Sequence, residues 1–331
     1  MKLETIHSKK VFLSPLDWGL GHCARLIPII KELFDNKCEV YLGVNEEQKQ
    51  FFENESLEIQ LLDFAGYDFK IPEKNWEWNF LLQSPKLIKK IDLESDLLKN
   101  LHSEHGFDIV ISDHRYGCRI ENVTSIFLTH QLNVPGKLLK KQINSLHKKY
   151  LSQFNFIWVY DDERNVAGEL SVSNEFSNTQ NIGVRSRFSI DHIKKKYDAL
   201  IIVSGPEPHR SNFRKLMLSR FDNSEYKIAM LGADVSGDLD RSEGNIDFVS
   251  HGSTEEMNEL INSADVIISK IGYTTLMDVI SLEKKAILCP TKGQGEQEYL
   301  ANLHKGKAKK IMVVSEDEMS PELLGIMLSQ E

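Results

Sequence analysis

Cysteine, proline and long apolar runs are scarce in this sequence, and each scarcity excludes a class of protein. The 331 residues include nine prolines and four cysteines, and the cysteines show neither a CxxC pair nor the spacing of a metal site. No apolar run approaches the length of a membrane span, and the first residues lack the pattern of a signal peptide. We therefore expect a cytoplasmic protein with reduced thiols, and neither a disulfide scaffold nor an integral membrane protein.

Excess positive charge is also lacking. Lys and Arg total 40 against 49 Asp and Glu, which gives a net charge of −9. Non-specific nucleic-acid binding depends on basic side chains that neutralise phosphates, so we predict no nucleic-acid partner. The local exception is the basic amphipathic segment 137–150. It is either a solvated helix face or a peripheral contact to an anionic surface, such as the inner membrane or a phosphate-bearing acceptor.

The sequence is rich in short apolar runs that alternate with amphipathic helical patterns. Lys10–Ser14 predicts a strand, for example, and residues 23–34 predict the helix that follows it, with apolar residues at helical spacing. This alternation is typical of an α/β protein with parallel sheets. The length is sufficient for two such domains, each with its own core.

The polar stretch 171–181 is interpreted as a linker between these two domains. We therefore predict an N-terminal Rossmann-like domain over residues 1–185 and a C-terminal Rossmann-like domain over residues 186–318. A terminal helix is expected in residues 319–331.

The most informative stretch is residues 264–301. Val266–Ser269 predicts a buried strand that ends in a glycine-bearing turn, and a helix begins near Thr274. The first turn of a helix has uncovered amides and the positive end of the helix dipole, so this junction suits a phosphate or pyrophosphate. Gly272 has a plainer alternative, because such turns are common in α/β domains. The candidate donor-binding residues here are Ser269, Gly272, Tyr273, Thr274 and Thr275.

Further polar residues are predicted at the same sheet edge. Asp278, one turn into the helix, can reach a ribose hydroxyl. The strand 286–289 leads into a loop with three hydrogen-bonding side chains in four positions, which a plain connection would not need: Gln294, Glu296 and Gln297. Another strand-to-loop transition, after residues 199–203, carries Ser204 and Gly205. We assign all of these residues to the donor side.

Histidine and aspartate follow strands in the N-terminal half. The loop after the first strand ends at His22, and the apolar strand 107–112 delivers Asp113 to the same edge. A neutral histidine is suited to act as a general base near pH 7, and an aspartate can hold its ring and stabilise the imidazolium. We therefore predict His22 and Asp113 as catalytic residues. The alternative for His22 is a cap on the helix that begins at Cys23.

Other residues near this pair are assigned to the acceptor side: Gly19, Gly21, His114 and His130. The two histidines are either acceptor ligands or satisfied structural groups. A metal site built from these side chains ranks low, because they include no local ligand pair such as HxxxH. We predict no metal and no cofactor.

Two motifs of the C-terminal half resemble one family. Residues 264–278 follow the pattern ADVIIS-x-x-G-x-T-T-x-x-D, and residues 290–297 follow P-T-x-G-Q-x-E-Q. This combination is similar to the donor-binding half of GT-B glycosyltransferases, in particular the family that includes the N-acetylglucosaminyltransferase of peptidoglycan lipid-intermediate synthesis. The resemblance implies two Rossmann-like domains that face each other across a cleft, with the terminal helix packing back towards the N-terminal domain.

The resemblance also implies roles for single residues. The glycine and hydroxyl turn would hold the nucleotide diphosphate, Gln297 would touch the sugar, and Asp278 would bind ribose. The family's usual residue at that last position is glutamate, so Asp278 is shorter by one methylene. In several inverting GT-B enzymes a histidine after the first strand, paired with an aspartate from a later strand end, is the base. His22 and Asp113 match those positions in kind.

The predicted function is an inverting, metal-independent transfer from a nucleotide diphosphate sugar to an acceptor hydroxyl. The resemblance favours a UDP-linked donor such as UDP-N-acetylglucosamine, and leaves the acceptor open among a glycan, a lipid-linked molecule and a small molecule. One alternative is a nucleotide-sugar hydrolase, because the GxGH-x-x-R run from Gly19 to Arg25 also resembles the corresponding loop of the nucleotide-sugar hydrolase of pseudaminic acid synthesis. A second alternative is a non-catalytic nucleotide-sugar-binding module.

Overall fold

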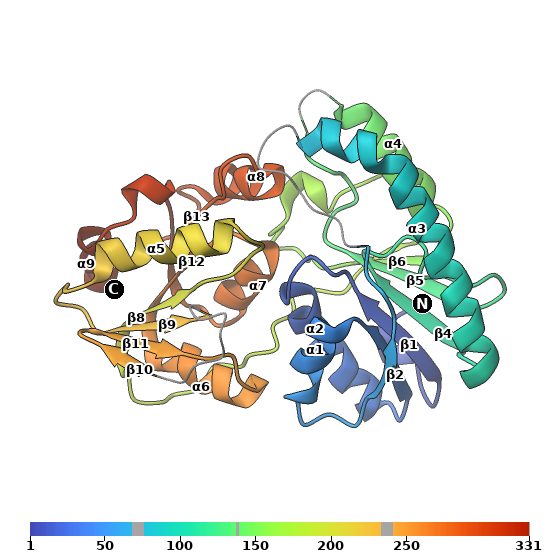
Figure 1. The fold of residues 1–331 in the computed structure, drawn as a ribbon, viewed down its shortest axis with the longest axis horizontal. Coiled ribbons are helices and arrows are strands. Elements are labelled where there is room, and N and C mark those ends of the chain that lie inside the picture. Colours follow the sequence, from blue (N-terminus) through green and yellow to red (C-terminus); the bar gives the residue numbers. More distant parts are fainter. Residues whose placement is uncertain (68–75, 137–138, 233–240, 331) are drawn as a thin grey trace. The chain divides into compact units, whose positions relative to one another are not determined.

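The chain forms two compact α/β units, Met1–Arg185 and Ser186–Glu331 (Figure 1). The computed structural model describes residues 1–67, 76–136, 139–232 and 241–330. The two units are described separately below.

The N-terminal unit is built on a seven-stranded parallel sheet in the order β3-β2-β1-β4-β5-β6-β7. Its central strands are apolar and buried along nearly their whole length, as expected for parallel strands covered on both faces. The strands are β1 (Lys10–Pro15), β2 (Glu39–Val44), β3 (Gln60–Asp63), β4 (Ile109–Asp113), β5 (Thr124–Thr129), β6 (Phe156–Val159) and β7 (Thr179–Asn181). The α-helices are α1 (Gly21–Asp35), α2 (Glu46–Glu53), α3 (Trp76–His105) and α4 (Lys140–Leu151).

The C-terminal unit has a second seven-stranded sheet in the order β10-β11-β9-β8-β12-β13-β14. All its pairings are parallel except the β10–β11 hairpin. The strands are β8 (Tyr197–Ile202), β9 (Ile228–Leu231), β10 (Arg241–Glu243), β11 (Ile246–Val249), β12 (Ala264–Lys270), β13 (Lys285–Cys289) and β14 (Ile311–Val313). The α-helices are α5 (His209–Phe221), α6 (Thr254–Ser263), α7 (Tyr273–Ser281), α8 (Gly295–His304) and α9 (Pro321–Ser329). The predicted class, α/β with two Rossmann-like sheets, is confirmed.

Each sheet has a point where the strand order reverses. In the N-terminal unit β2 lies on one side of β1 and β4 on the other, and in the C-terminal unit β9 and β12 flank β8 in the same way. Ligands of open parallel sheets bind outside the carboxyl ends of the strands at such reversals. The topology therefore marks the ends of β1 and β4 in one unit, and of β8 and β12 in the other, as binding edges.

The polar stretch 171–181 contains more order than a linker would. Its last residues form β7, which pairs with β6 through Ile157 and Thr179 and extends the first sheet. Asn178 supports this edge by donating to the carbonyl oxygen of Phe154 at 3.0 Å. Because a short edge strand needs only backbone pairing and leaves its other side open to water, polar residues can form it. The prediction of a linker throughout 171–181 is corrected accordingly.

The terminal helix α9 belongs to the core of its own unit. Leu324 and Met327 are fully buried there with Met319, in one cluster with residues of β8 and β12. The apolar face of α9 is therefore already covered by the sheet of the C-terminal unit. That the helix packs back towards the N-terminal domain stays a prediction.

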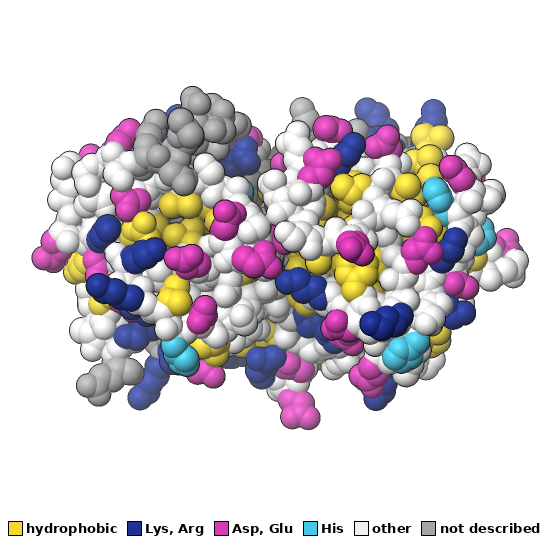
Figure 2. All heavy atoms as spheres, turned by 90° about the horizontal axis from the view of Figure 1, so that it is seen from below, with side chains coloured by type: hydrophobic (Ala, Val, Ile, Leu, Met, Phe, Trp, Pro, Cys, Tyr) yellow, Lys and Arg dark blue, Asp and Glu magenta, His cyan; other side chains and the backbone are white. Residues whose placement is uncertain are grey.

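The surface is mixed in charge. On the face shown in Figure 2, Lys and Arg side chains are interspersed with Asp and Glu. Helix α4 turns Ile143 and Leu151 into the core, while Lys148 pairs with Glu175. Both interpretations of segment 137–150 stay predictions, and residues 137 and 138 lie outside the described residues. None of the helices in the described ranges combines the length and apolar character needed to cross a membrane.

Candidate active site

His22 and Asp113 are brought together at the carboxyl edge of the first sheet. Asp113 ends β4, and His22 is the second residue of α1, which follows β1. Nδ1 of His22 lies 2.8 Å from Oδ2 of Asp113. The Asp113 side chain is fully buried, whereas that of His22 is 16% exposed. Because the pair uses Nδ1, Nε2 on the far side of the ring is the atom that can exchange a proton with a substrate.

The alternative role of His22 as a helix cap is not what the structure shows. The N-cap of α1 is Leu20, and no side chain caps the helix. Gly19 has φ +91, a value that favours glycine, and it turns the chain from β1 into α1. Gly21 is the first helical residue. These two glycines thus shape the turn that presents His22.

Arg25 completes this arrangement, and the sequence analysis did not include it among the site residues. Its Nε donates to Oδ2 of Asp113 at 2.9 Å, and its Nη2 donates to Oδ1. Its Nη1 lies 3.1 Å from Nδ1 of His130. A spacing of three residues places Arg25 one turn after His22 on the same helix face. That spacing, within the GxGH-x-x-R run, was the available signal.

The protonation states of the pair follow from this arrangement. Burial favours the neutral acid form of Asp113, but the guanidinium of Arg25 and the ring of His22 outweigh it and lower the pKa of Asp113. Burial and the positive charge of Arg25 lower the pKa of His22, against the opposing effect of Asp113. At neutral pH the site therefore holds a carboxylate beside a neutral imidazole.

His114 and His130 lie beside this pair. The rings of His22 and His114 are 5.6 Å apart, and those of His114 and His130 are 5.3 Å apart. Nε2 of His114 lies 2.9 Å from Oγ1 of Thr129, and burial lowers the pKa of His114 well below its usual value. The predicted acceptor-side histidines are thus gathered at one edge, where His130 contacts Arg25 and His114 has a protein partner.

A buried ion pair supports the turn after β4. The Arg115 and Glu94 side chains pair with each other and are 0% and 3% exposed. Arg115 also donates to Oγ of Ser14 at 3.1 Å, and the amide of Gly117 donates to Glu94 at 2.9 Å. Removing one partner of a buried pair leaves an uncompensated charge, so breaking this pair is costly. The intact network therefore fixes the backbone next to Asp113. It is a support for the candidate site and not part of its chemistry.

In the C-terminal unit, Gly272 is the N-cap of α7. Its φ of −88 does not require glycine. A Cβ added there would meet only Oγ1 of Thr275, at 3.9 Å. Neither backbone strain nor packing within this unit requires glycine at the position.

The residues around Gly272 differ in what they offer a ligand. Thr274 and Thr275 are partly exposed in the first turn of α7. Ser269 and Tyr273 are buried, and the Ser269 hydroxyl donates to the carbonyl oxygen of Ile202 at 3.2 Å. The hydroxyl of Ser269 therefore bridges β12 to β8. Because Ser269 and Tyr273 are buried, their side chains have little surface with which to make the predicted donor contacts.

Two more predicted donor residues lie at the same edge. Ser204 and Gly205 are exposed just after β8, the neighbour of β12 in the sheet, and Gly205 has φ +102.

Oδ1 of Asp278 accepts from the Ser186 hydroxyl at 2.5 Å. Burial raises the pKa of Asp278 to about 6, against the effects of this bond and of Arg187. Asp278 is thus an ionisable group that changes charge close to neutral pH.

The loop before α8 uses its polar side chains more than the sequence suggested. Gln294 caps α8 by accepting from the amide of Gln297 at 2.5 Å. The side-chain oxygen of Gln297 accepts from the amide of Thr291 at 2.7 Å. The cap and the loop therefore use two of these side chains, and the expectation that a plain connection would need none of them is wrong. The partly exposed Glu296 and the side-chain amide NH2 groups of Gln294 and Gln297 are among the groups that this loop can offer a ligand.

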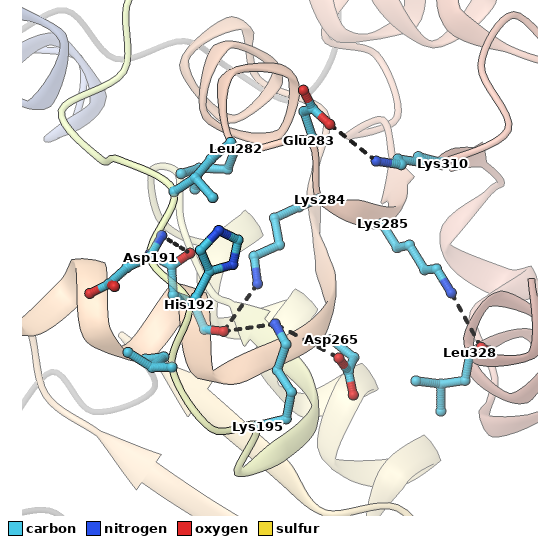
Figure 3. A pocket seen from close by; sticks show the side chains of 13 residues that line it. Asp191, His192, Lys195, Asp265, Leu282, Glu283, Lys284, Lys285, Lys310 and Leu328 are labelled. Atoms are coloured by element: carbon cyan, nitrogen blue, oxygen red, sulfur yellow. Dashed lines mark hydrogen bonds and ion pairs between the residues drawn. The ribbon is translucent and has the colours of Figure 1, made fainter. Parts of the chain in front are cut away.

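A cavity of about 570 Å³ lies at the opposite edge of the second sheet, by the amino ends of β8, β12 and β13 (Figure 3). Lys195 and Lys284 both donate there to the carbonyl oxygens of Asn262 and Ala264. These carbonyls lie at the end of α6, where cations are favourable. The lysines are therefore structural, and the cavity is separate from the carboxyl-edge residues. Among the described residues, no group of three or more His, Cys, Asp or Glu side chains is arranged to hold a metal ion.

Comparisons with known proteins concern the fold and the C-terminal unit. Residues 233–329 match the Glycosyltransferase family 28 C-terminal domain. SnogD from Streptomyces nogalater, a glycosyltransferase, is similar in structure with a TM-score of 0.65 at 12% identity, covering 98% of this chain and 91% of that one. MurG from Acinetobacter baumannii has a TM-score of 0.52 at 11% identity, covering 97% and 90%. The spinosyn rhamnosyltransferase SpnG, complexed with thymidine diphosphate, has a TM-score of 0.60 at 9% identity, covering 97% and 90%. Among curated proteins, none matches the sequence.

These likenesses show the fold of the chain: two Rossmann-like α/β units of the GT-B type, as in solved glycosyltransferases. The family 28 match lies within the C-terminal unit, over residues 233–329, and is a likeness of that part of the chain.

Proposed function

We propose that this protein transfers a sugar, with inversion and without a metal ion, from a nucleotide diphosphate sugar to an acceptor hydroxyl, with His22 as the general base. The observation that carries the proposal is the pairing of His22 with Asp113 at the strand-order reversal of the first sheet. That pairing holds the imidazole through Nδ1 and leaves Nε2 for the acceptor. Asp113 is the orienting group.

The reaction is a single displacement at the anomeric carbon. The acceptor oxygen forms a bond to that carbon while the bond to the diphosphate oxygen breaks, and the acceptor proton passes to Nε2 of His22. The electron pair leaves with the nucleoside diphosphate. The amides and hydroxyls of the first turn of α7 would receive this developing charge at the positive end of the helix dipole. The donor is a co-substrate, and the proposal includes no cofactor.

The proposed donor is UDP-linked, with UDP-N-acetylglucosamine as the first candidate. The motifs in residues 264–297 support this assignment through the resemblance described above. The acceptor is a glycan, a lipid-linked molecule or a small molecule. A lipid-linked acceptor would require a cytoplasmic protein that meets the membrane surface peripherally, and the lysines of α4 are the contact proposed for that case.

Donor affinity is expected to depend on pH through Asp278. A carboxylate at this position accepts hydrogen bonds from ribose hydroxyls, whereas the protonated form loses part of this capacity. Because the pKa of Asp278 is about 6, the Kd for the donor should rise severalfold as the pH falls through that value. Titration calorimetry between about pH 5 and about pH 8 measures this change. An Asp278→Asn variant serves as the control and should show a flat profile. The same pH dependence in that variant would remove Asp278 from the donor site.

The proposed activity is tested with a panel of nucleotide sugars and no acceptor. Calorimetry follows binding and chromatography follows breakdown of each sugar nucleotide. Tight binding of one donor with only slow release of nucleotide supports a transferase that awaits its acceptor. Rapid release of free sugar and nucleotide would instead favour the hydrolase alternative, with water in place of the acceptor. Binding that does not depend on His22 and Asp113, without turnover for any acceptor tried, would favour a non-catalytic module.

A further inference from the structure

Nδ1 of His22 lies between a group that only accepts hydrogen bonds and a group that only donates them. Oδ2 of Asp113 is 2.8 Å away, and Nη2 of Arg25 is 2.7 Å away. A proton on Nδ1 forms a hydrogen bond with the carboxylate but meets the N–H of the guanidinium. Without that proton the preference reverses. Asp113 and Arg25 therefore act on the same ring nitrogen in opposite senses.

Arg25 is held in this position by more than its contact with His22. Its Nε and Nη2 engage both oxygens of Asp113, and its Nη1 reaches His130. The side chains of Arg25 and Asp113 are 2% and 0% exposed. Charges removed from water interact strongly, so the guanidinium largely offsets the negative charge that Asp113 would otherwise exert on the imidazole.

We propose that Arg25 is a positioning residue that cancels the charge of Asp113 while leaving its orienting hydrogen bond in place, so that His22 stays a neutral base in acidic solution. The inference rests on the proposed role of His22 as base. An Asp–His pair without such a cation would bind a proton more tightly, because the carboxylate would stabilise the imidazolium.

Four ionisable groups face His22 within the described part of the N-terminal unit. Arg25 comes from α1, Asp113 ends β4, and His114 and His130 follow β4 and β5. His130 and Arg25 act in the same direction on the pKa of His22, and Asp113 acts against them. A base works only when unprotonated, so activity falls as the pH drops through the pKa of His22. A lower pKa therefore moves the acidic limit of activity downward.

The test measures the pKa and tautomer of His22 directly, by NMR titration of the isotopically labelled histidine rings in the ligand-free protein. The His22 signal is assigned from its loss in His22→Gln. In the wild-type protein we expect a pKa below 6.5, the ordinary value, with the neutral ring protonated on Nδ1. Arg25→Gln should raise this pKa by about one to three pH units, because Asp113 is then unopposed.

Two further variants separate this role from a merely structural one. Arg25→Lys keeps the positive charge but loses the two-atom contact of the guanidinium with the Asp113 carboxylate. The pKa of His22 should therefore stay close to its wild-type value, while the plateau of kcat should fall. Arg164→Lys alters the surface pair of Arg164 with Asp162 and should leave His22 unchanged. The acidic limb of the kcat/KM profile should move with the NMR pKa in each variant.

The outcomes are decisive even if Arg25→Gln fails to fold. A wild-type His22 pKa at or above 6.5 overturns the inference by itself, as does a folded Arg25→Gln with an unchanged pKa. The failure of the proposed function looks different. In that case His22→Gln keeps full turnover, whatever the NMR titration gives.

Discussion

Replacing His22 by alanine is expected to lower kcat by about 10²- to 10⁴-fold, the usual contribution of a general base, while the Kd for the nucleotide sugar stays within about twofold. The reason is that the proposed base and the proposed phosphate turn belong to different units. His22 pairs with Asp113 in the N-terminal unit, whereas the proposed phosphate turn at Gly272 belongs to the C-terminal unit. Single-turnover kinetics with a matched acceptor measures the loss, and titration calorimetry measures donor affinity.

A matched control is His7→Ala, which removes an exposed histidine of the same unit and should keep wild-type turnover. His22→Ala is also expected to abolish the acidic limb of the pH–rate profile, because the group that titrates there is gone. Full turnover by a folded His22→Ala protein that still binds donor would eliminate His22 as the base.

The second large effect is expected at Gly272. Gly272→Leu should weaken donor binding by about 10²-fold or more, since a branched side chain would fill the space that a diphosphate needs against the first-turn amides of α7. Gly272→Ala should have a smaller effect in the same direction. Calorimetric titration with the nucleotide sugar and with the nucleoside diphosphate alone measures both variants.

This test separates donor binding from folding, because glycine is not needed at this position for folding. The φ of −88 is open to any residue, and an added Cβ meets only Oγ1 of Thr275 at 3.9 Å. The thermal midpoint of both variants should therefore stay close to that of the wild-type protein. Wild-type donor affinity in Gly272→Leu would show that the phosphate turn has been assigned to the wrong place.

Much of the fold could be predicted because buried parallel strands have a clear sequence pattern. Residues 10–14 and 286–289 were expected as strands, and they lie within β1 and β13. Edge elements were harder to predict. Strand β7 is made of three polar residues whose pairing depends on β6 and not on their own apolarity.

The candidate site was predictable to the extent that strand ends define it. His22 and Asp113 were expected together because the carboxyl ends of parallel strands meet at one edge. Arg25 was not, because its role depends on how α1 is rotated about its axis, which brings its guanidinium onto Asp113. Gln294 and Gln297 were interpreted as ligand groups, although the same residue types also cap helices and close loops.

The sequence by itself determined the alternation of strands and helices, the parallel sheets that follow from it, and the residues that leave each strand at its carboxyl end. These are local properties, set by apolar periodicity and by chain direction. The tertiary structure alone decided which polar groups form hydrogen bonds within the protein and which remain available to a ligand. Buried and partly buried hydrogen bonds join residues far apart in the chain, such as Arg25 with Asp113 and Ser186 with Asp278. Their partners follow from three-dimensional packing and not from spacing in the sequence.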